Sequence, residues 1–259
     1  MKFFLPLLLL FSFVVHASNT LPLNFDHAHV KFDGLLKNFT SQKDGQTWVD
    51  YVGFKASGRG DLQTYLRTLS AVTPAQYQAF SADERLAFLI NAYNAFTLEW
   101  ILIHHPVKSI KDTGSLLSSP WKKVFPGYKL LGSKFTLDNI EHERIRVEFK
   151  EPRIHFAVNC ASIGCPSLRP RAYTGTGLQA ELAEAELAFF KNPGKFFVKN
   201  KTAHLSSILD WYGEDFENVF GSVEAYVVER AKFYGVAGDL PAQNIDIEFL
   251  DYDWKLNGK

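Results

Sequence analysis

Cysteine is scarce in this chain, with two residues among 259. A protein with so few cysteines is not built on a framework of disulfides, so its hydrophobic core has to supply its stability. An excess of charge of either sign is also missing, because 28 lysines and arginines are matched by 28 aspartates and glutamates. Without a basic surface, the chain has no general attraction for nucleic acid or for an anionic membrane.

Several short motifs are missing as well. The sequence contains no glycine-rich phosphate loop, no dinucleotide-binding fingerprint and no Gly-x-Ser-x-Gly motif, which disfavours nucleotide-binding proteins and serine hydrolases. The charged run 141–144 lacks the His-Glu-x-x-His spacing of zinc peptidases, and we expect it to form an exposed charged face. The sequence therefore predicts neither a metal site nor a cofactor.

The N-terminal residues have the composition of a secretory signal peptide. Lys2 is followed by an apolar run from Phe3 to Val15, and Ala17 supplies a small residue for cleavage. We therefore predict that residues 1–17 are removed and that the protein is exported, being either periplasmic or secreted. The apolar run is short for a spanning helix, so no transmembrane helix is expected after cleavage, and an uncleaved anchor is the alternative.

The rest of the chain predicts one α+β domain. We expect residues 18–47 to form an N-terminal helical lead-in and residues 48–257 to form the domain. Helical patterns and short strands mix without a regular β-α-β alternation, which favours a helix-rich domain packed around a small, mostly antiparallel sheet. The expected strands form two hairpins, at 128–136 and 196–208, and a C-terminal strand from residue 245. The oligomeric state is left open.

The strongest predicted helix follows a capping box at Ser81 and Glu84 and is apolar on almost every side. Within it, Asn91, Asn94 and Thr97 recur every three residues and form a polar stripe. A buried amide without a hydrogen bond is unfavourable, so this stripe needs partners. Two interpretations stay open: the side chains bond to neighbouring backbone, or they face a polar pocket.

Both cysteines lie in one segment, which begins with an apolar run over residues 154–158. We predict a buried strand there, ending in a turn that contains glycine and proline. His155 lies on this strand and Cys160 follows directly after it. Alternation along the strand places His155 and Asn159 on one face. A thiol at the end of a strand, with an imidazole on the same strand, is a suitable place for a nucleophile.

Short motifs are spread along the chain between residues 48 and 257. They are 89–95 (Leu-Ile-Asn-Ala-Tyr-Asn-Ala), 137–141 (Leu-Asp-Asn-Ile-Glu), 153–160, 164–169, 172–173, 211–216 (Trp-Tyr-Gly-Glu-Asp-Phe) and 252–257 (Tyr-Asp-Trp-Lys-Leu-Asn). In order and spacing they resemble the domain of unknown function 547 family. The resemblance implies that the asparagine helix and the cysteine segment belong to one domain. Because the activity of the family is unknown, it implies no catalytic role.

The first hypothesis for the cysteine segment is a thiol enzyme. Cys160 would be the nucleophile and His155 the imidazole that lowers its pKa, with the amide of Asn94 or Asn91 orienting the ring. Backbone N–H groups of the 161–164 turn would stabilise an oxyanion. The reaction would be acyl transfer on a peptide or amide in the cell envelope.

Together with Asn91, four other residues are candidates for binding the substrate. Arg153 and Arg169 flank the cysteines in sequence and would hold a substrate carboxylate. Asn159 shares a face with the histidine, and Tyr173 would line a pocket. The ligand would be a small molecule or a peptide. Solvated arginines and a core aromatic residue are the ordinary alternatives.

The second hypothesis is a structural disulfide between Cys160 and Cys165. The pair would close a short loop in an oxidising compartment, and closing a loop of this size stabilises a fold by roughly 2 kcal/mol. The domain would then be a binding or interaction module without a catalytic thiol. A third hypothesis is a pair that cycles between dithiol and disulfide, although its spacing differs from that of the usual redox motif.

Overall fold

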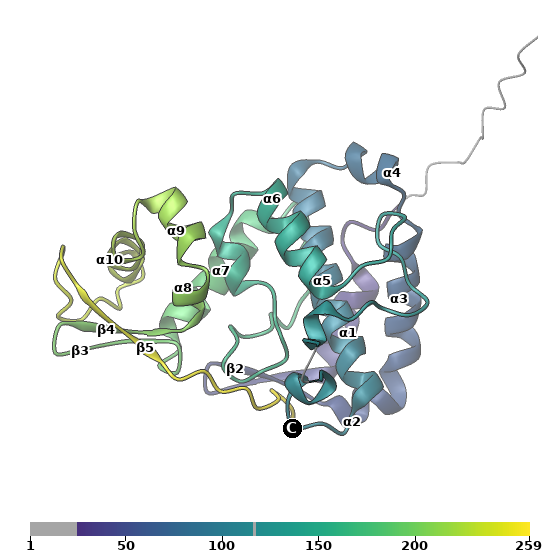
Figure 1. Cartoon of the computed structure of the whole chain (residues 1–259), viewed down its shortest axis with the longest axis horizontal. Helices are drawn as coiled ribbons and strands as arrows, with labels where there is room; N and C mark the ends of the chain where they lie inside the picture. Colours follow the sequence, from purple (N-terminus) through teal and green to yellow (C-terminus); the bar gives the residue numbers. More distant parts are fainter. Residues whose placement is uncertain (1–24, 116–117) are drawn as a thin grey trace, which may run out of the picture.

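The protein has a helix-rich α+β fold, as the sequence predicts (Figure 1). The computed structural model describes residues 25–115 and 118–259, so the predicted signal peptide lies outside the described residues. The helices, which include 3₁₀ and π types, are α1 (Val30–Phe39), α2 (Tyr51–Gly53), η1 (Phe54–Gly58), α3 (Arg59–Ala71), α4 (Pro74–Ala79), α5 (Ala82–His104), η2 (Ile110–Thr113), η3 (Pro120–Lys122), η4 (Asn139–Ile145), α6 (Arg146–Glu148), η5 (Pro152–Phe156), α7 (Leu178–Lys191), α8 (Ile208–Trp211), α9 (Gly213–Phe220) and α10 (Val223–Phe233). The strands are β1 (Thr40–Lys43), β2 (Gln46–Val49), β3 (Phe196–Lys199), β4 (Thr202–Ser206) and β5 (Asp246–Leu250).

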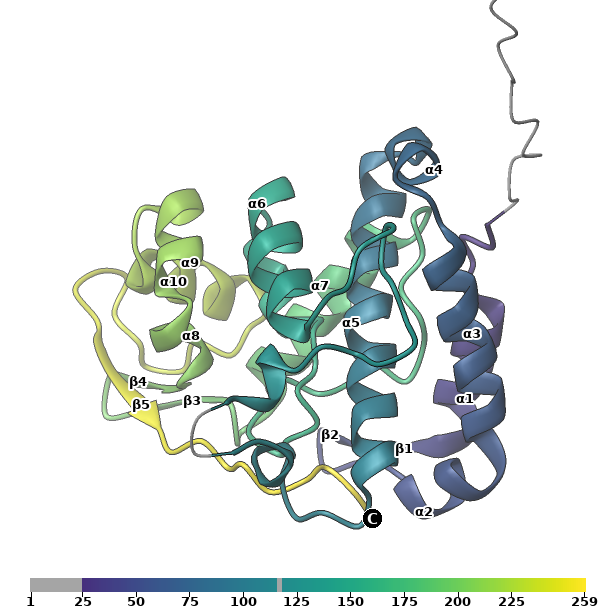
Figure 2. The ribbon, with the colours of Figure 1, turned by 45° about the vertical axis from the view of Figure 1, so that its right-hand side comes forward.

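Helix α5 is the central element of the fold (Figure 2). Its capping box is formed, because Ser81 Oγ accepts the N–H of Glu84 while the Glu84 carboxylate accepts the N–H of Ser81. Every residue from Leu86 to Leu102 is buried, so the helix is surrounded by packing on all sides. In the described part of the chain, α5 is the one helix long and apolar enough to cross a membrane, and 94% of its apolar window is buried inside the fold.

Two hydrophobic cores lie on either side of the region that holds the cysteines. The larger core is built around α5 by α1, α3 and α4. The smaller core is built by α7, α9 and α10 with β3 and β4. Figures 1 and 2 show α1 and α3 toward one end of the molecule and α9 and α10 toward the other, with α6 between them. The region between the two cores is therefore where residues that are distant in the sequence meet.

The strands form two small sheets. β1 and β2 are an antiparallel pair, β3 and β4 are antiparallel, and β5 lies parallel to β4. The predicted 196–208 hairpin and C-terminal strand are confirmed, whereas the predicted 128–136 hairpin is reduced to one bridge between Leu130 and Ser133. After β5, residues 251–259 return to the larger core, where Val49 N–H donates to Asn257 O. We call residues 251–259 the closing segment.

The segment before the cysteines is helical, and the strand predicted there is wrong. Pro152–Phe156 forms a 3₁₀ helix whose first turn is capped by the Glu151 side chain, which accepts the N–H of Arg153. Proline suits this turn because its missing N–H would have no helical partner. Most of these residues are buried, and a short apolar run does not distinguish a buried strand from a buried helical turn.

Acid is expected to destabilise the fold through His29, at the start of α1. This residue is 1% exposed, its Nδ1 lies 2.7 Å from the Tyr65 hydroxyl, and burial lowers its pKa from 6.5 to about 4. Between these two pH values the unfolded chain binds a proton that the folded chain does not bind. The stability from this site is therefore complete above pH 6.5 and decreases as the pH falls, by roughly 3 kcal/mol at pH 4.

Urea denaturation at several pH values between 7 and 4 measures this dependence. His29→Leu should show a flatter decrease in unfolding free energy than the wild type, because it removes the titrating group. His105→Gln, at the end of α5, is the matched control and should keep the wild-type slope. Identical slopes for the wild type and His29→Leu would contradict the prediction.

Candidate functional site

Amide side chains shape residues 157–166, which we call the cysteine loop. Asn94 Nδ2 donates to Ala157 O at 2.9 Å, and Asn159 N–H donates to Asn94 Oδ1 at 2.8 Å. The Asn159 side chain donates to Pro166 O and accepts the N–H of Ala161. Both amides are buried, so they hold the loop from behind. The predicted contact between Asn94 and the histidine is not made. Asn94 bonds to backbone groups instead, which is one of the two interpretations of the asparagine stripe.

The closing segment holds the other side of the cysteine loop. The N–H groups of Ile163 and Gly164 donate to Lys255 O and Asp253 O, at 2.8 and 2.7 Å. A Cβ on Gly164 would lie 2.7 Å from the Tyr252 ring and 2.8 Å from the backbone nitrogen of Asp253, so this close approach requires glycine. Because these two N–H groups are already bonded, they do not provide the oxyanion site predicted for this turn.

The two cysteines are free thiols held close together. Cys160 N–H donates to Cys165 Sγ at 3.1 Å. Cys160 Sγ lies 3.1 Å from the hydroxyl of Ser162 and 3.1 Å from the hydroxyl of Tyr252. Cys160 is half-buried, whereas Cys165 is buried. Neither sulfur takes part in a disulfide, so the predicted bond is not seen.

The surroundings of Cys160 favour its thiolate. The adjoining Cys165 thiol, the hydroxyls of Ser162 and Tyr252, and the Ser162 N–H lower the pKa of Cys160 to about 7, although burial acts in the opposite direction. Burial raises the pKa of Cys165, and that of Tyr252, well above their ordinary values. Both groups therefore keep their protons at neutral pH, and a large fraction of Cys160 is ionised there.

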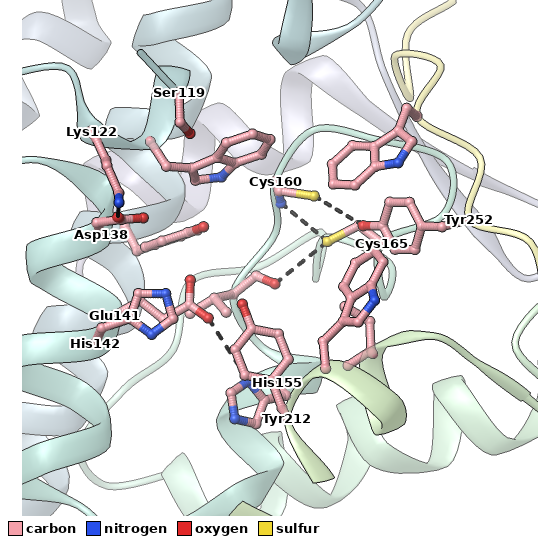
Figure 3. Close-up of a pocket in the computed structure, with 16 residues that line it drawn as sticks. Ser119, Lys122, Asp138, Glu141, His142, His155, Cys160, Cys165, Tyr212 and Tyr252 are labelled. Atoms are coloured by element: carbon pink, nitrogen blue, oxygen red, sulfur yellow. Dashed lines mark hydrogen bonds and ion pairs between the residues drawn. The ribbon is translucent and has the colours of Figure 1, made fainter. Parts of the chain in front are cut away.

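Cys160 lies on a cavity of about 220 Å³ between the two cores (Figure 3). The aromatic residues of its lining are Tyr93, Trp121, Trp211, Tyr212, Tyr252 and Trp254. The ring centroids of Tyr252 and Trp254 are 4.4 Å apart, and Trp211 stacks on Trp254 at 5.8 Å. A ligand in this cavity would meet flat apolar faces beside a thiol.

Acidic and imidazole side chains form the wall across the cavity from the thiols (Figure 3). They are Asp138, Glu141, His142 and His155. His155 Nε2 lies 2.7 Å from Asp215 Oδ2, and the His155 ring stacks on Tyr212 with centroids 4.0 Å apart. Burial acts to raise the pKa of Asp215, but hydrogen bonds from His155 and Arg146 hold it well below its usual range.

Glu141 is 4% exposed, so the prediction of an exposed face over residues 141–144 is wrong at this position. The error arises because the charge of a side chain does not reveal which side of a helix packs inward, and η4 turns this residue toward the cavity. Glu143 and Arg144 are exposed, as predicted. Within residues 25–115 and 118–259, no group of three or more His, Cys, Asp or Glu side chains is arranged to hold a metal ion.

Comparison with known proteins finds a family model that is similar to the part of the chain that holds the cysteine loop and η4. The model of a family described as protein of unknown function, DUF547, matches residues 77–190. The predicted family resemblance is confirmed. The DUF547 match runs from α4 to α7 and includes the cysteine loop and η4, whereas α8, α9 and the closing segment lie beyond it. No curated protein matches the chain, and no solved structure matches it.

The structure brings the predicted Cys160 and His155 to the same cavity without joining them. His155 is bonded to Asp215, and no hydrogen bond between His155 and Cys160 is present in the described part of the chain. The groups next to the sulfur are instead the hydroxyls of Ser162 and Tyr252. The side chains in hydrogen-bond contact with the thiol are thus neutral hydroxyls and not the predicted imidazole.

The residues predicted to bind substrate are all outside the lining of this cavity: Asn91, Arg153, Asn159, Arg169 and Tyr173. Asn91 exchanges two hydrogen bonds with the backbone of Tyr173, whose ring is buried. The two arginines are paired with Glu151 and Glu184. These residues therefore hold the domain together around the cavity.

Among the residues of the site that were not predicted from the sequence are Glu141, Ser162, Asp215 and Tyr252. Tyr252 is 92 positions from Cys160, and Asp215 is 60 positions from His155. Glu141, Asp215 and Tyr252 all lie within the family-like motifs at 137–141, 211–216 and 252–257. Those motifs were the signal in the sequence that could have pointed to these residues, although the motifs do not show which of their side chains come into contact.

Removing the two hydroxyls beside Cys160 is expected to make its thiol less acidic. The double variant Ser162→Ala, Tyr252→Phe leaves the thiolate without two donors, so its pKa should rise by about one unit. Alkylation by iodoacetamide at pH 6 should then slow roughly tenfold, because the thiolate reacts and the thiol does not. Mass spectrometry across pH 5 to 9 measures the midpoint. Tyr128→Phe is the matched control, and an unchanged midpoint in the double variant would contradict the prediction.

Proposed function

We propose that this protein is a cysteine-dependent acyl-transfer enzyme, of the peptidase or amidase type, with Cys160 as its nucleophile. The observation that carries the proposal is the place of the Cys160 sulfur. It lies on an aromatic-walled cavity and 3.1 Å from each of two hydroxyl donors. A thiolate is a far better nucleophile than a thiol, and these donors favour the thiolate near neutral pH.

The proposed reaction has two steps. The Cys160 thiolate attacks the carbonyl carbon of an amide or ester, a C–S bond forms, and the carbonyl electron pair moves to oxygen. When that pair returns, the bond to the leaving group breaks, and the leaving amine or alcohol takes up a proton. Water then attacks the thioester, and the carboxylic acid and the thiolate are released. An amine in place of water would make the reaction a transpeptidation.

The size and walls of the cavity favour a small molecule or the end of a peptide as the substrate. About 220 Å³ is small for a binding site, and the tryptophan faces suit a ligand with a flat apolar group. Trp211 is 48% exposed, so the lining reaches solvent at this residue. Action in the cell envelope depends on the signal predicted for residues 1–17.

The direct test is reaction of the folded protein with 4-nitrophenyl acetate, followed by intact-protein mass spectrometry. The proposal predicts that one acetyl group is added at Cys160 and is then lost as water regenerates the thiol. An adduct that forms no faster than acetylation of surface lysines, or one that is never hydrolysed, would refute the proposal.

A binding module with a Cys160–Cys165 disulfide is the second candidate. The 3.1 Å contact between Cys160 N and Cys165 Sγ supports it, because the thiols are already held together and an exported protein meets oxidising conditions. The aromatic cavity would then bind a ligand without chemistry. Alkylation before and after mild reduction separates the candidates, since the disulfide protein labels only after reduction. Labelling that alternates reversibly with oxidation would favour the cycling pair.

A further inference from the structure

Glu141 is a buried carboxylate in the wall across the cavity from Cys160 (Figure 3). It belongs to η4, a π-helical segment over Asn139–Ile145. π-helical turns are rare and occur frequently at functional sites. In this one, Glu141 and His142 both reach the cavity lining. The proposed acyl transfer gives Cys160 a role but leaves this wall without one.

Glu141 is held by aromatic neighbours rather than by a lysine or arginine. Burial and the charge of the adjacent Glu141 carboxylate raise the pKa of Tyr212, and His155 Nδ1 lies 3.9 Å from Glu141 Oε1. Among the described residues, His155 is the one ion-pair partner of Glu141.

His155 is itself fixed from behind by a charged chain. Its Nε2 is bonded to Asp215, and Arg146 holds Asp215 with two hydrogen bonds of 2.6 and 2.8 Å. The other ring nitrogen, Nδ1, is buried and has no hydrogen-bond partner within the described residues. The chain of Arg146, Asp215 and His155 therefore ends at Glu141 and orients the ring toward it.

We propose that Glu141 is the residue that transfers protons during acyl transfer by Cys160, and that His155 is a positioning residue for it. This inference rests on the proposed function. Glu141, in its protonated form, passes its proton to the leaving amine or alkoxide when the tetrahedral intermediate formed by the Cys160 thiolate breaks down. In the second step the Glu141 carboxylate takes a proton from the attacking water, and the Cys160 thiolate is released as the thioester bond breaks. The protons balance over the cycle, and one water is consumed.

The test compares two esters that differ in their need for a proton. 4-Nitrophenolate leaves readily as an anion, whereas phenolate is more basic and leaves more readily with the help of an acid. In Glu141→Gln, acylation of Cys160 by 4-nitrophenyl acetate should stay within about twofold of wild type, while acylation by phenyl acetate should fall about 100-fold. Glu143→Gln, an exposed neighbour on the same segment, is the matched control and should change neither rate.

The outcomes separate the two proposals. Unchanged rates, or an equal fall with both esters, would overturn the role of Glu141 while leaving that of Cys160 intact. Failure of wild-type Cys160 to react even with 4-nitrophenyl acetate would overturn the proposed function itself. A further measurement needs no variant. From 4-nitrophenyl acetate to phenyl acetate, the acylation rate of the wild-type protein should fall by a smaller factor than the acylation rate of free N-acetylcysteine. A fall as steep as that of the free thiol would also overturn the role of Glu141.

Discussion

Replacing Cys160 with alanine is expected to lower the rate of acyl transfer from 4-nitrophenyl acetate by roughly 1,000-fold or more, because the nucleophile is removed. Cys165 is not expected to replace it. That thiol is buried, and burial raises its pKa well above the ordinary value, so it stays protonated. The release of 4-nitrophenolate measures the rate, and intact-protein mass spectrometry shows whether any acetyl group is attached.

Cys165→Ala is the matched control, since it removes a thiol from the same loop and keeps the proposed nucleophile. Acylation should continue at Cys160, with a midpoint shifted to higher pH, because the Cys165 thiol is the largest cause of the lowered pKa of Cys160. Loss of acylation in Cys165→Ala alone would show that the nucleophile is wrongly assigned. Equal loss in both variants would favour the cycling pair.

Asn94→Leu is expected to destabilise the fold by roughly 4 kcal/mol. The substitution leaves two buried backbone groups, Ala157 C=O and Asn159 N–H, without the bonds they make to the amide. Each unpaired buried group is unfavourable by about 1–3 kcal/mol, and leucine also differs in shape from the amide. Urea denaturation measures the difference in unfolding free energy, and a loss below about 1 kcal/mol would contradict the prediction.

Asn91→Leu separates stability from the state of the thiol. Asn91 makes the same two kinds of bond one turn earlier on α5, to the backbone of Tyr173 instead of the cysteine loop. Both variants should therefore lose similar stability, but only Asn94→Leu should shift the pH midpoint of Cys160 alkylation. An equal shift in both would mean that general loosening of the fold, and not the bond to the loop, controls the thiol.

The sequence predicted the elements that local signals define. The capping box at Ser81 forms as expected, because it depends on two side chains three residues apart. The hairpin of β3 and β4 depends on a short turn between two apolar runs and is also confirmed. The error at η5 has the opposite origin. Its residues are apolar because they are buried, and burial by itself carries no preference between strand and helix.

What the sequence alone determined is the helix-rich class, the buried α5 with its asparagine stripe, and a loop that carries both thiols. These follow from residues close together in the chain. Only the tertiary structure decided that Tyr252 meets Cys160 and that Asp215 meets His155. The physical reason is that these partners are brought together by the packing of the second core and by the path of the closing segment. No local pattern records which distant side chains such packing brings within hydrogen-bond distance.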